Sequence, residues 1–297
     1  MTRYLRRLYG RLPLIREVKR IDSSLAVISR ELQQLSTVAM IESLSTIMRR
    51  DPRYEDRLRL PRYGAQYWSQ HYEDGMIAEL FRRISTNERT FVEIGVGNGS
   101  ENNTTALLSD GWRGWWIEGN QADCQFIRDR LKEMPEIARR LRLVESMVAP
   151  DTISALFANN GIPEEVDLFS LDIDQDTYHV WAALTRFRPR AVVVEYNAGI
   201  PPCQSWICPR KPGATWNGTQ AFGASLKAYE NLGRRLHYLL VGCDISGTNA
   251  FFVREDLVSD KFAAPFTAEN HYEPPRYHPL FRWGHPAYFF GESDPER

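Results

Sequence analysis

A short apolar run ends in a carboxylate and is followed by three evenly spaced glycines, in the stretch Phe91-Val-Glu-Ile-Gly-Val-Gly-Asn-Gly-Ser. Gly95, Gly97 and Gly99 lack a Cβ atom, so the backbone there can adopt positive φ values and a ligand can approach it closely. A strand that passes through such a loop into a helix is typical of the first turn of a doubly wound α/β sheet, where ligands bind at the carboxyl ends of the strands. Because Glu93 precedes the glycines, the spacing differs from the dinucleotide fingerprint and favours a cationic or donor-rich ligand over a phosphate. The alternative is a glycine-rich turn that binds nothing.

A second carboxylate, Glu118, ends the apolar run Trp115-Trp-Ile-Glu. It lies about 20 residues beyond the glycine loop, the offset at which an acidic residue meets ribose hydroxyls in Rossmann-like nucleotide sites. A carboxylate can accept hydrogen bonds from both hydroxyls of a diol. Taken alone, Glu118 is better explained as a solvated strand end, but after the glycine loop and at this offset the binding role is favoured.

The most acidic stretch is Leu171-Asp-Ile-Asp-Gln-Asp-Thr-Tyr-His, and the next expected strand ends in Glu195-Tyr-Asn197. The alternating Asp172, Asp174 and Asp176 would project to one side in extended geometry. Such carboxylates cannot share a small space without protons or a cation. Oxygen ligands from two neighbouring strand ends suit Mg²⁺ or Mn²⁺. The alternative is that one aspartate caps the following helix and the others are solvated.

His179 follows this acidic stretch near the start of a helix. Its ordinary pKa is close to 6.5, so it could deprotonate a hydroxyl group at neutral pH. A structural role is the alternative, and His71 is a weaker competitor for the same function.

These stretches together resemble the class I S-adenosylmethionine (SAM) methyltransferases over roughly residues 65–255. The matched segments are 91–105, 116–120, 167–174 and 192–197. Ser69-Gln-His-Tyr-Glu-Asp-Gly75 resembles the entry to the helix that precedes the first strand in FkbM-type sequences. By this resemblance the cofactor-binding residues are Glu93, Gly95, Gly97, Gly99, Asn103, Glu118, Gly119 and Asp172.

The carboxylates at the strand ends also resemble those of metal-dependent sugar O-methyltransferases. In that group Mg²⁺ holds two substrate hydroxyls and a His or Asp acts as base. The resemblance implies Asp174, Asp176, Glu195 and Asn197 as metal ligands, and His179, Asp174 and Asp172 as catalytic residues. The sequence departs from the group at Glu195-Tyr-Asn197, where those enzymes often carry an Asp-Asp or Glu-Asp pair.

Length and composition are those of an ordinary soluble protein: 297 residues, a net charge of −1, 25% charged and 43% apolar residues. This near-neutral balance gives no overall attraction to nucleic acid. The sequence contains no run of 18 apolar residues, so we expect no transmembrane helix. We also expect no signal peptide at the N-terminus. The four cysteines lack zinc-ligand spacing and are expected to be free thiols in a reducing cytoplasm.

The pattern beyond the glycine loop alternates strands with helices, which predicts a mostly parallel sheet covered on both faces. Expected strands are 115–118, 141–145, 166–173, 191–196, 237–242 and 249–254, and expected helices are 76–84, 104–110, 121–140, 152–159, 178–187 and 224–236. The last two strands form a hairpin, as expected for the antiparallel end of the seven-stranded, Rossmann-like class I methyltransferase sheet. A long loop over 198–220 is expected to act as a lid or to be disordered.

The N-terminal region is expected to stand apart from this domain. Residues 1–20 form a basic arm, which either frays or contacts an anionic surface such as the inner face of a membrane. Ile21, Leu25, Ile28, Leu32 and Leu35 follow a 4-3-4-3 spacing on a helix over 21–48. That stripe packs either on its own domain or on another copy of the chain. We therefore expect an arm, helix and linker over 1–60, a methyltransferase domain over 61–260 and an irregular tail over 261–297.

Three functions fit these features. The leading one is SAM-dependent O-methylation of a sugar or another polyhydroxylated acceptor, assisted by Mg²⁺, in glycan or natural-product synthesis. The second is metal-independent N-methylation of a small molecule or a protein. The third is a scaffold for glycan assembly that binds SAM without turnover.

Overall fold

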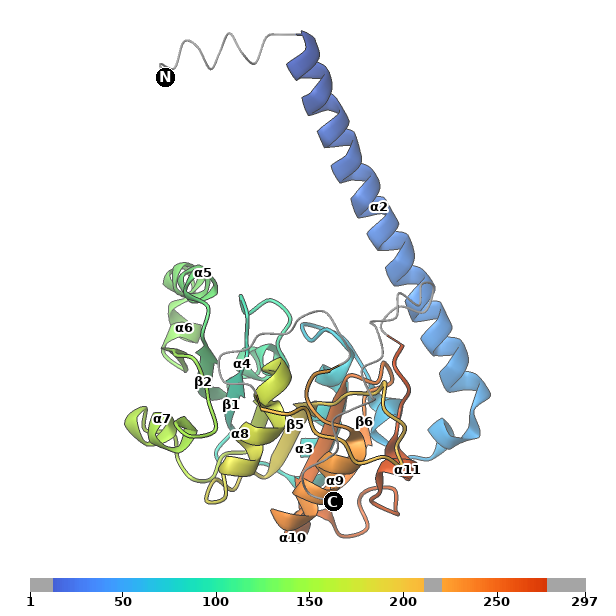
Figure 1. Cartoon of the computed structure of the whole chain (residues 1–297), viewed down its shortest axis with the longest axis vertical. Coiled ribbons are helices and arrows are strands. Elements are labelled where there is room, and N and C mark those ends of the chain that lie inside the picture. The colour runs from blue at the N-terminus through green and yellow to red at the C-terminus, as the bar shows by residue number, and fades with distance from the viewer. Residues whose placement is uncertain (1–12, 211–220, 277–297) are drawn as a thin grey trace. The chain divides into compact units, whose positions relative to one another are not determined.

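The computed structural model describes residues 13–210 and 221–276, and Figure 1 shows the chain. The long helix α2 (Pro13–Arg50) and the part that begins at Pro52 belong to two separate compact units. Each is therefore described by itself. The first twelve residues of the predicted basic arm lie outside the described residues, as does most of the tail predicted over 261–297.

The second unit is built on a seven-stranded sheet with the order β3-β2-β1-β4-β5-β7-β6. Every neighbouring pair from β3 to β5 is parallel, whereas β7 runs antiparallel to both β5 and β6. The strands are β1 (Thr90–Ile94), β2 (Arg113–Glu118), β3 (Leu141–Glu145), β4 (Leu168–Leu171), β5 (Ala191–Glu195), β6 (Tyr238–Cys243) and β7 (Asn249–Arg254). This topology confirms the predicted fold class.

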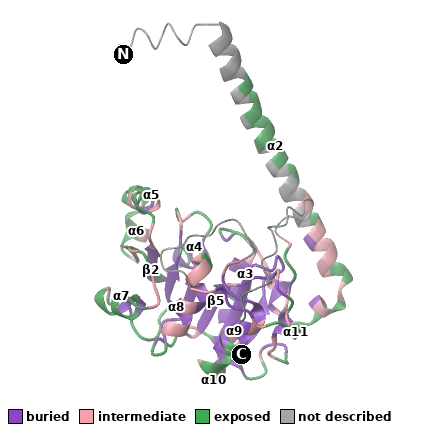
Figure 2. Cartoon of the chain, in the orientation of Figure 1, coloured by how far each residue is buried: buried purple, intermediate pink, exposed green. Residues whose placement is uncertain are grey.

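Two layers of helices cover the sheet, because alternate residues of each strand point to opposite faces. On one face lie α7 (Ile153–Asn159), α8 (Thr177–Ala183), α9 (Leu226–Arg235) and α11 (Ala268–His271). On the other lie α3 (Glu73–Ile84), α4 (Thr105–Ser109), α5 (Gln121–Lys132) and α10 (Glu255–Val258). Figure 2 shows that buried residues concentrate in the sheet and on the inner sides of these helices.

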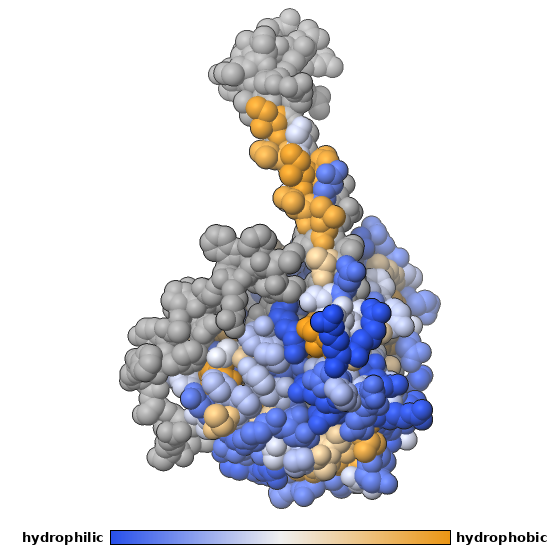
Figure 3. Space-filling view, turned by 90° about the vertical axis from the view of Figure 1, so that its right-hand side faces the viewer, coloured by the Kyte–Doolittle hydropathy of each residue, from blue (hydrophilic) through white to orange (hydrophobic). Residues whose placement is uncertain are grey.

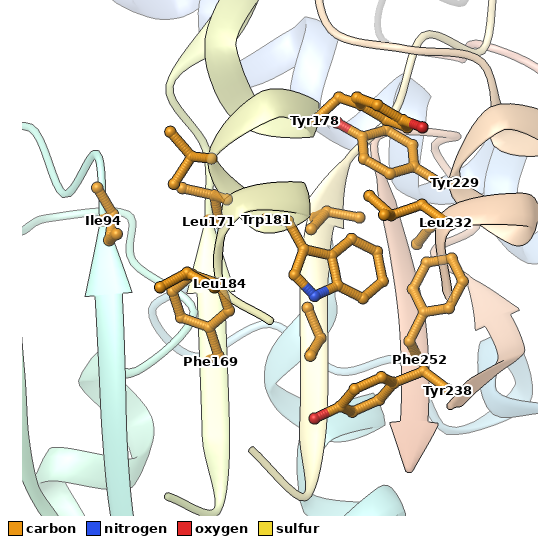
Figure 4. Packing of buried hydrophobic residues seen from close by; sticks show 14 of the residues in the cluster. Ile94, Phe169, Leu171, Tyr178, Trp181, Leu184, Tyr229, Leu232, Tyr238 and Phe252 are labelled. Atoms are coloured by element: carbon orange, nitrogen blue, oxygen red, sulfur yellow. The ribbon is translucent and has the colours of Figure 1, made fainter. Parts of the chain in front are cut away.

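The core under α8 and α9 is rich in aromatic residues (Figure 4). Trp181 packs edge-on to Phe252 of β7, with ring centroids 5.0 Å apart, and stacks on Tyr229 at 6.1 Å. Such pairs stabilise by about 0.5–1.5 kcal/mol beyond the area they bury. This packing fixes α8, and with it the acidic loop that precedes α8, against the end of the sheet.

The segment 49–68 was expected to be a linker, but much of it is folded onto the second unit. It contains two 3₁₀ turns, η1 (Pro52–Glu55) and η2 (Leu60–Tyr63), and Tyr54 and Leu60 are buried. Arg59 donates to the backbone and side chain of Asn270 at 2.9 and 2.6 Å. The polar composition that suggested a linker thus serves specific hydrogen bonds between distant parts of the chain.

Two other expectations differ from the structure. The helix predicted over 121–140 is divided into α5 and α6 (Pro135–Ala138), because proline cannot continue the hydrogen-bonding pattern of a helix. The tail is packed as far as it is described, since Phe262, Ala268 and His271 are buried.

The helix α2 contains the predicted stripe and is longer than expected. Across residues 13–210 and 221–276, no helix combines the length and the apolar character needed to cross a membrane.

Candidate active site

The carboxyl ends of the parallel strands bring four predicted residues to one edge of the sheet. Ile94 of β1 is paired with Ile117 of β2 and with Leu171 of β4, and Leu171 is paired with Val194 of β5. The residues that follow at this level are Gly95, Glu118, Asp172 and Glu195. Sequence positions up to 100 residues apart therefore meet where ligands bind in sheets of this kind.

The three glycines after β1 have different roles. A Cβ atom at Gly95 would lie 1.6 Å from the carbonyl oxygen of Asp172, so glycine is required for the loop to pass β4. A Cβ atom at Gly99 would lie 2.8 Å from the ring of Trp116, so this glycine serves packing. Gly97 has a φ of +52° and nothing within 4 Å of the position that a Cβ atom would take. Gly97 is therefore the glycine that leaves the backbone open to a ligand.

Glu93 holds the loop from below. It is 5% exposed, and its carboxylate accepts hydrogen bonds from the backbone N–H groups of Asn103 and Thr104 at 2.9 and 3.1 Å. The Thr104 hydroxyl and the Asn102 amide also donate to it. Burial raises the pKa of Glu93, and these donors oppose the rise. Glu93 therefore holds the glycine loop against the start of α4, and it also lines one of the cavities described below, so its predicted contact with the cofactor stays a prediction.

Glu118 lies at the end of β2 and is half-buried. One carboxylate oxygen accepts from the Gly97 N–H at 2.7 Å, and the other accepts from the Asn120 N–H at 2.7 Å. A carboxylate has about four lone-pair sites, so each oxygen can accept a further hydrogen bond. Glu118 therefore shapes the glycine loop and can still bind a diol.

Two cavities open at this edge of the sheet. The first, here the Glu118 cavity, has a volume of about 610 Å³ and is lined by Glu118, Gly119, Met147 and Ile173, among others. The second, here the His71 cavity, has a volume of about 390 Å³ and is lined by Gln70, His71, Glu73, Glu101, Asn103 and Asn249, among others. Both volumes are within the range of small-molecule sites.

The two cavities meet at three residues, because Gly95, Gly97 and Asp172 line both. A ligand that spans the cavities would pass these residues. A larger hollow of about 740 Å³ near Tyr67 and Trp112 contains none of the strand-end carboxylates.

Asp172 and Glu195 form a pair that shares a proton. Their side chains are hydrogen-bonded to each other. Burial raises the pKa of Glu195 well above its usual value, and the charge of Asp172 raises it further. Glu195 is therefore protonated and donates the hydrogen bond. Asp172 reaches into the cleft, but its surrounding protein atoms and the charge of Asp174 raise its pKa to about 6. The repulsion expected between these carboxylates is therefore relieved by a proton.

The predicted metal set is not assembled as expected. Among the described residues, no group of three or more His, Cys, Asp or Glu side chains is arranged to hold a metal ion. Asn197 is buried, and its amide oxygen accepts from the Gly199 N–H at 3.1 Å while its nitrogen donates to the Phe222 carbonyl at 3.2 Å. Asp174 and Asp176 line the Glu118 cavity, whereas Glu195 is paired with Asp172. Asp176, a candidate helix cap, makes no capping hydrogen bond to α8.

The two histidines occupy different places from those expected. Nε2 of His179 lies 2.9 Å from the Cys208 carbonyl oxygen, so this ring fastens α8 to the loop after β5. His179 is absent from the lining of both cavities, whereas His71 lines one of them. Burial lowers the pKa of His71, so its ring is neutral at pH 7 and able to accept a proton.

Sequence reasoning missed the acidic group beside His71. Glu73 is 1% exposed, and its carboxyl group accepts hydrogen bonds from the Asn249 side-chain amide at 2.6 Å and from the backbone N–H of His71 at 2.7 Å. Burial and the nearby charge of Asp244 raise the pKa of Glu73 to about 8. Glu73 lies in the stretch 69–75, whose resemblance to FkbM-type sequences was the only sequence feature that pointed to this segment.

The strand order, the antiparallel β7 and the cleft over Gly97 define the Rossmann-like class I methyltransferase fold. No protein-family model and no curated protein matches this chain. Among solved structures, the glycopeptide N-methyltransferase MtfA in complex with SAM is 14% identical, with a TM-score of 0.37 over 59% of this chain and 85% of that one. The magnesium protoporphyrin IX methyltransferase ChlM from Synechocystis PCC 6803, with bound SAH, is 10% identical, with a TM-score of 0.42 over 61% and 81%. This likeness is too slight to say what the chain acts on.

Proposed function

We propose that this chain is a methyltransferase that transfers the methyl group of SAM to a hydroxyl group of a polyhydroxylated acceptor. The observation that carries the proposal is the junction of the two cavities at Gly95, Gly97 and Asp172. One cavity has the features of a nucleoside site and the other is rich in hydrogen-bonding groups. A reacting pair placed in them would meet at a carboxylate.

The residues of the Glu118 cavity fit the adenosyl part of SAM. Glu118 retains acceptor capacity for two ribose hydroxyls, and the open space over Gly97 lets a ligand lie against the backbone. Apolar side chains, including Met147 and Ile173, provide a surface on which the adenine ring can pack. The carboxylates that line the cleft suit a ligand with a positive charge. When bound, SAM supplies an electrophilic methyl group on its sulfonium.

Asp172 is the proton acceptor in this proposal. General bases work best with a pKa near the operating pH, and Asp172 has a pKa of about 6 because the surrounding protein atoms and the charge of Asp174 disfavour its ionised form. Glu195 donates a hydrogen bond to it and so fixes its orientation. His71, which is neutral at pH 7 and lines the His71 cavity, binds or orients the acceptor hydroxyl in this proposal.

A sugar-like acceptor is supported by the lining of the His71 cavity. Gln70, Asn102, Asn103 and Asn249 offer amide groups, and Glu73 and Glu101 offer carboxyl groups. Many short polar side chains suit a ligand with several hydroxyls. Mg²⁺ assistance is not carried into the proposal, because Asn197 is committed to the backbone and Glu195 to Asp172.

An amine acceptor is the second candidate. None of the described residues that line the His71 cavity is Lys or Arg, whereas Glu101 and Asp172 line it, together with Glu73, which holds a proton at neutral pH. Such a surface attracts an ammonium group, whose proton must also be removed before methyl transfer.

The test is a radiolabelled-methyl assay over matched hydroxylated and amine acceptors, each with and without EDTA. Methyl transfer to hydroxylated acceptors that survives EDTA and is lost in Asp172→Asn supports the proposal. Transfer to amines alone supports the second candidate. If EDTA abolished the activity and Mg²⁺ restored it, the metal-assisted mechanism would be supported instead. SAM binding without transfer to any acceptor would favour the scaffold.

A further inference from the structure

The helix α2 exposes an apolar seam that methyl transfer does not use. Ile21, Leu25, Ile28, Leu32 and Leu35 are 50 to 67% exposed. Figure 3 shows apolar side chains following one another along this helix. Contiguous apolar surface of this kind marks an interaction site on a soluble protein.

The spacing of the seam is that of a coiled coil. With about 3.6 residues per turn, its five residues fall within an arc of roughly 80°. Sequence positions 14, 18 and 39, which are Leu, Val and Ala, continue the same 4-3-4-3 repeat in both directions within α2. The repeat therefore covers more than three heptads. A seam this narrow matches a second helix, whereas a helix that packs on a globular core has a wider apolar face.

The residues beside the seam argue against a lipid surface as its partner. The exposed Ser24, Ser29 and Glu31 flank it, so two hydroxyl groups and a carboxylate lie beside the seam. A helix that lies on an anionic membrane carries its Lys and Arg beside a broad apolar face.

We infer that α2 pairs with α2 of a second copy of this chain, forming a coiled coil that holds the protein as a homo-oligomer. Two identical seams are self-complementary, as an interface between equal subunits requires. Each leucine and isoleucine of the seam would then fill a hole between four side chains of the facing helix. This inference is independent of the proposed methyl transfer, because no residue of the cleft takes part in it.

The test compares three full-length proteins by light scattering coupled to size exclusion. The unaltered chain should have a mass of at least twice the 34.4 kDa of one chain. The double variant Leu25→Asp with Leu32→Asp places charges in the seam and should have the mass of one chain. Val27→Asp is the matched control: Val27 is 53% exposed on the same helix but lies outside the seam, so this variant should keep the mass of the unaltered chain.

Circular dichroism and a thermal melt of each variant confirm that the second unit stays folded. A single-chain mass for the unaltered protein would overturn the inference, and so would an oligomer that persists in the double variant. Flotation with phosphatidylserine vesicles provides a further arm. A contradicting result is that the unaltered chain and Val27→Asp both bind the vesicles while the double variant Leu25→Asp with Leu32→Asp does not. That result would show that the seam binds a membrane, and it would overturn the pairing.

Discussion

Replacement of the buried Glu73 by glutamine should change how the stability of the fold depends on pH. Glu73 begins α3, where the helix dipole normally favours an ionised carboxylate. Burial nevertheless raises its pKa to about 8, with help from the charge of Asp244. The folded chain therefore holds a proton on Glu73 that the unfolded chain releases at lower pH.

The sign of the effect follows from this proton. Between the usual pKa of 4.5 and about 8, the folded state binds more protons than the unfolded state, so the free energy of unfolding falls as the pH rises. The slope for one such group is about 1.4 kcal/mol per pH unit. Because Glu73 is coupled to its neighbours, we expect a total loss on the order of 3 kcal/mol between pH 5 and pH 8. Melting temperatures should then fall by roughly 6–12 °C.

The assay is urea or thermal unfolding of the unaltered chain and Glu73→Gln across this pH range. The variant should show a constant offset, because its amide cannot accept both of the hydrogen bonds from His71 and Asn249, but it should lack the decline. Glu79 of the same helix is the matched control. Hydrogen bonds from Arg82 at 2.6 Å and Arg83 at 2.8 Å lower its pKa, so its contribution is present at neutral pH and is lost as the pH falls through its folded pKa.

Glu79→Gln should thus be most destabilising at neutral pH and should approach the unaltered chain in acid. The reasoning is refuted if the free energies of the unaltered chain and Glu73→Gln stay parallel from pH 5 to pH 8. A Glu79 variant with the same pH dependence as Glu73→Gln would refute it equally.

Two further predictions concern the cleft, and a third concerns the loop that His179 holds. Glu118→Ala should weaken SAM binding by about 1.5–3 kcal/mol, because it removes the ribose acceptor and the bond to the glycine loop; calorimetry measures this loss. Asp172→Asn should abolish methyl transfer while SAH binding changes little, and the rate of the unaltered enzyme should fall in acid with an apparent pKa near 6. His179→Ala should leave SAM affinity unchanged and should speed proteolysis of the loop that contains Cys208, because its ring holds that loop; gel electrophoresis of the digest tests this.

The order of strands and helices in the second unit could be read from the sequence because each element carries its own periodicity. The expected bounds of β3 and β7 agree with the structure, as do the glycine loop and the carboxylate at the end of β2. The antiparallel pair at the end was expected from two neighbouring strands that a short turn joins into a hairpin. Asp244 holds this turn by accepting from the Thr248 N–H at 3.0 Å.

The functions of individual carboxylates could not be read in the same way. Glu93 and Glu118 both end apolar runs, yet Glu93 is buried and holds the loop before α4, whereas Glu118 is half-buried and lines the Glu118 cavity. That difference depends on the face of each strand and on where the strand stops, which sequence fixes to within a residue or two at best. The pairing of Asp172 with Glu195 depends on the register of two parallel strands. The position of His71 depends on how the segment before α3 packs against the start of β7, where Asn249 donates a hydrogen bond to Glu73.

The most direct test of the account is calorimetric titration of the full chain with SAM. Two glycines with positive φ provide a matched pair: Gly97 borders both cavities, and Gly111 lies in the turn before β2, where an added Cβ atom would meet only Arg140 at 3.6 Å. Leucine strains the backbone at either position. The account predicts saturable SAM binding that Gly97→Leu abolishes and Gly111→Leu retains. Absence of binding to the unaltered chain, or full affinity in Gly97→Leu, would contradict it.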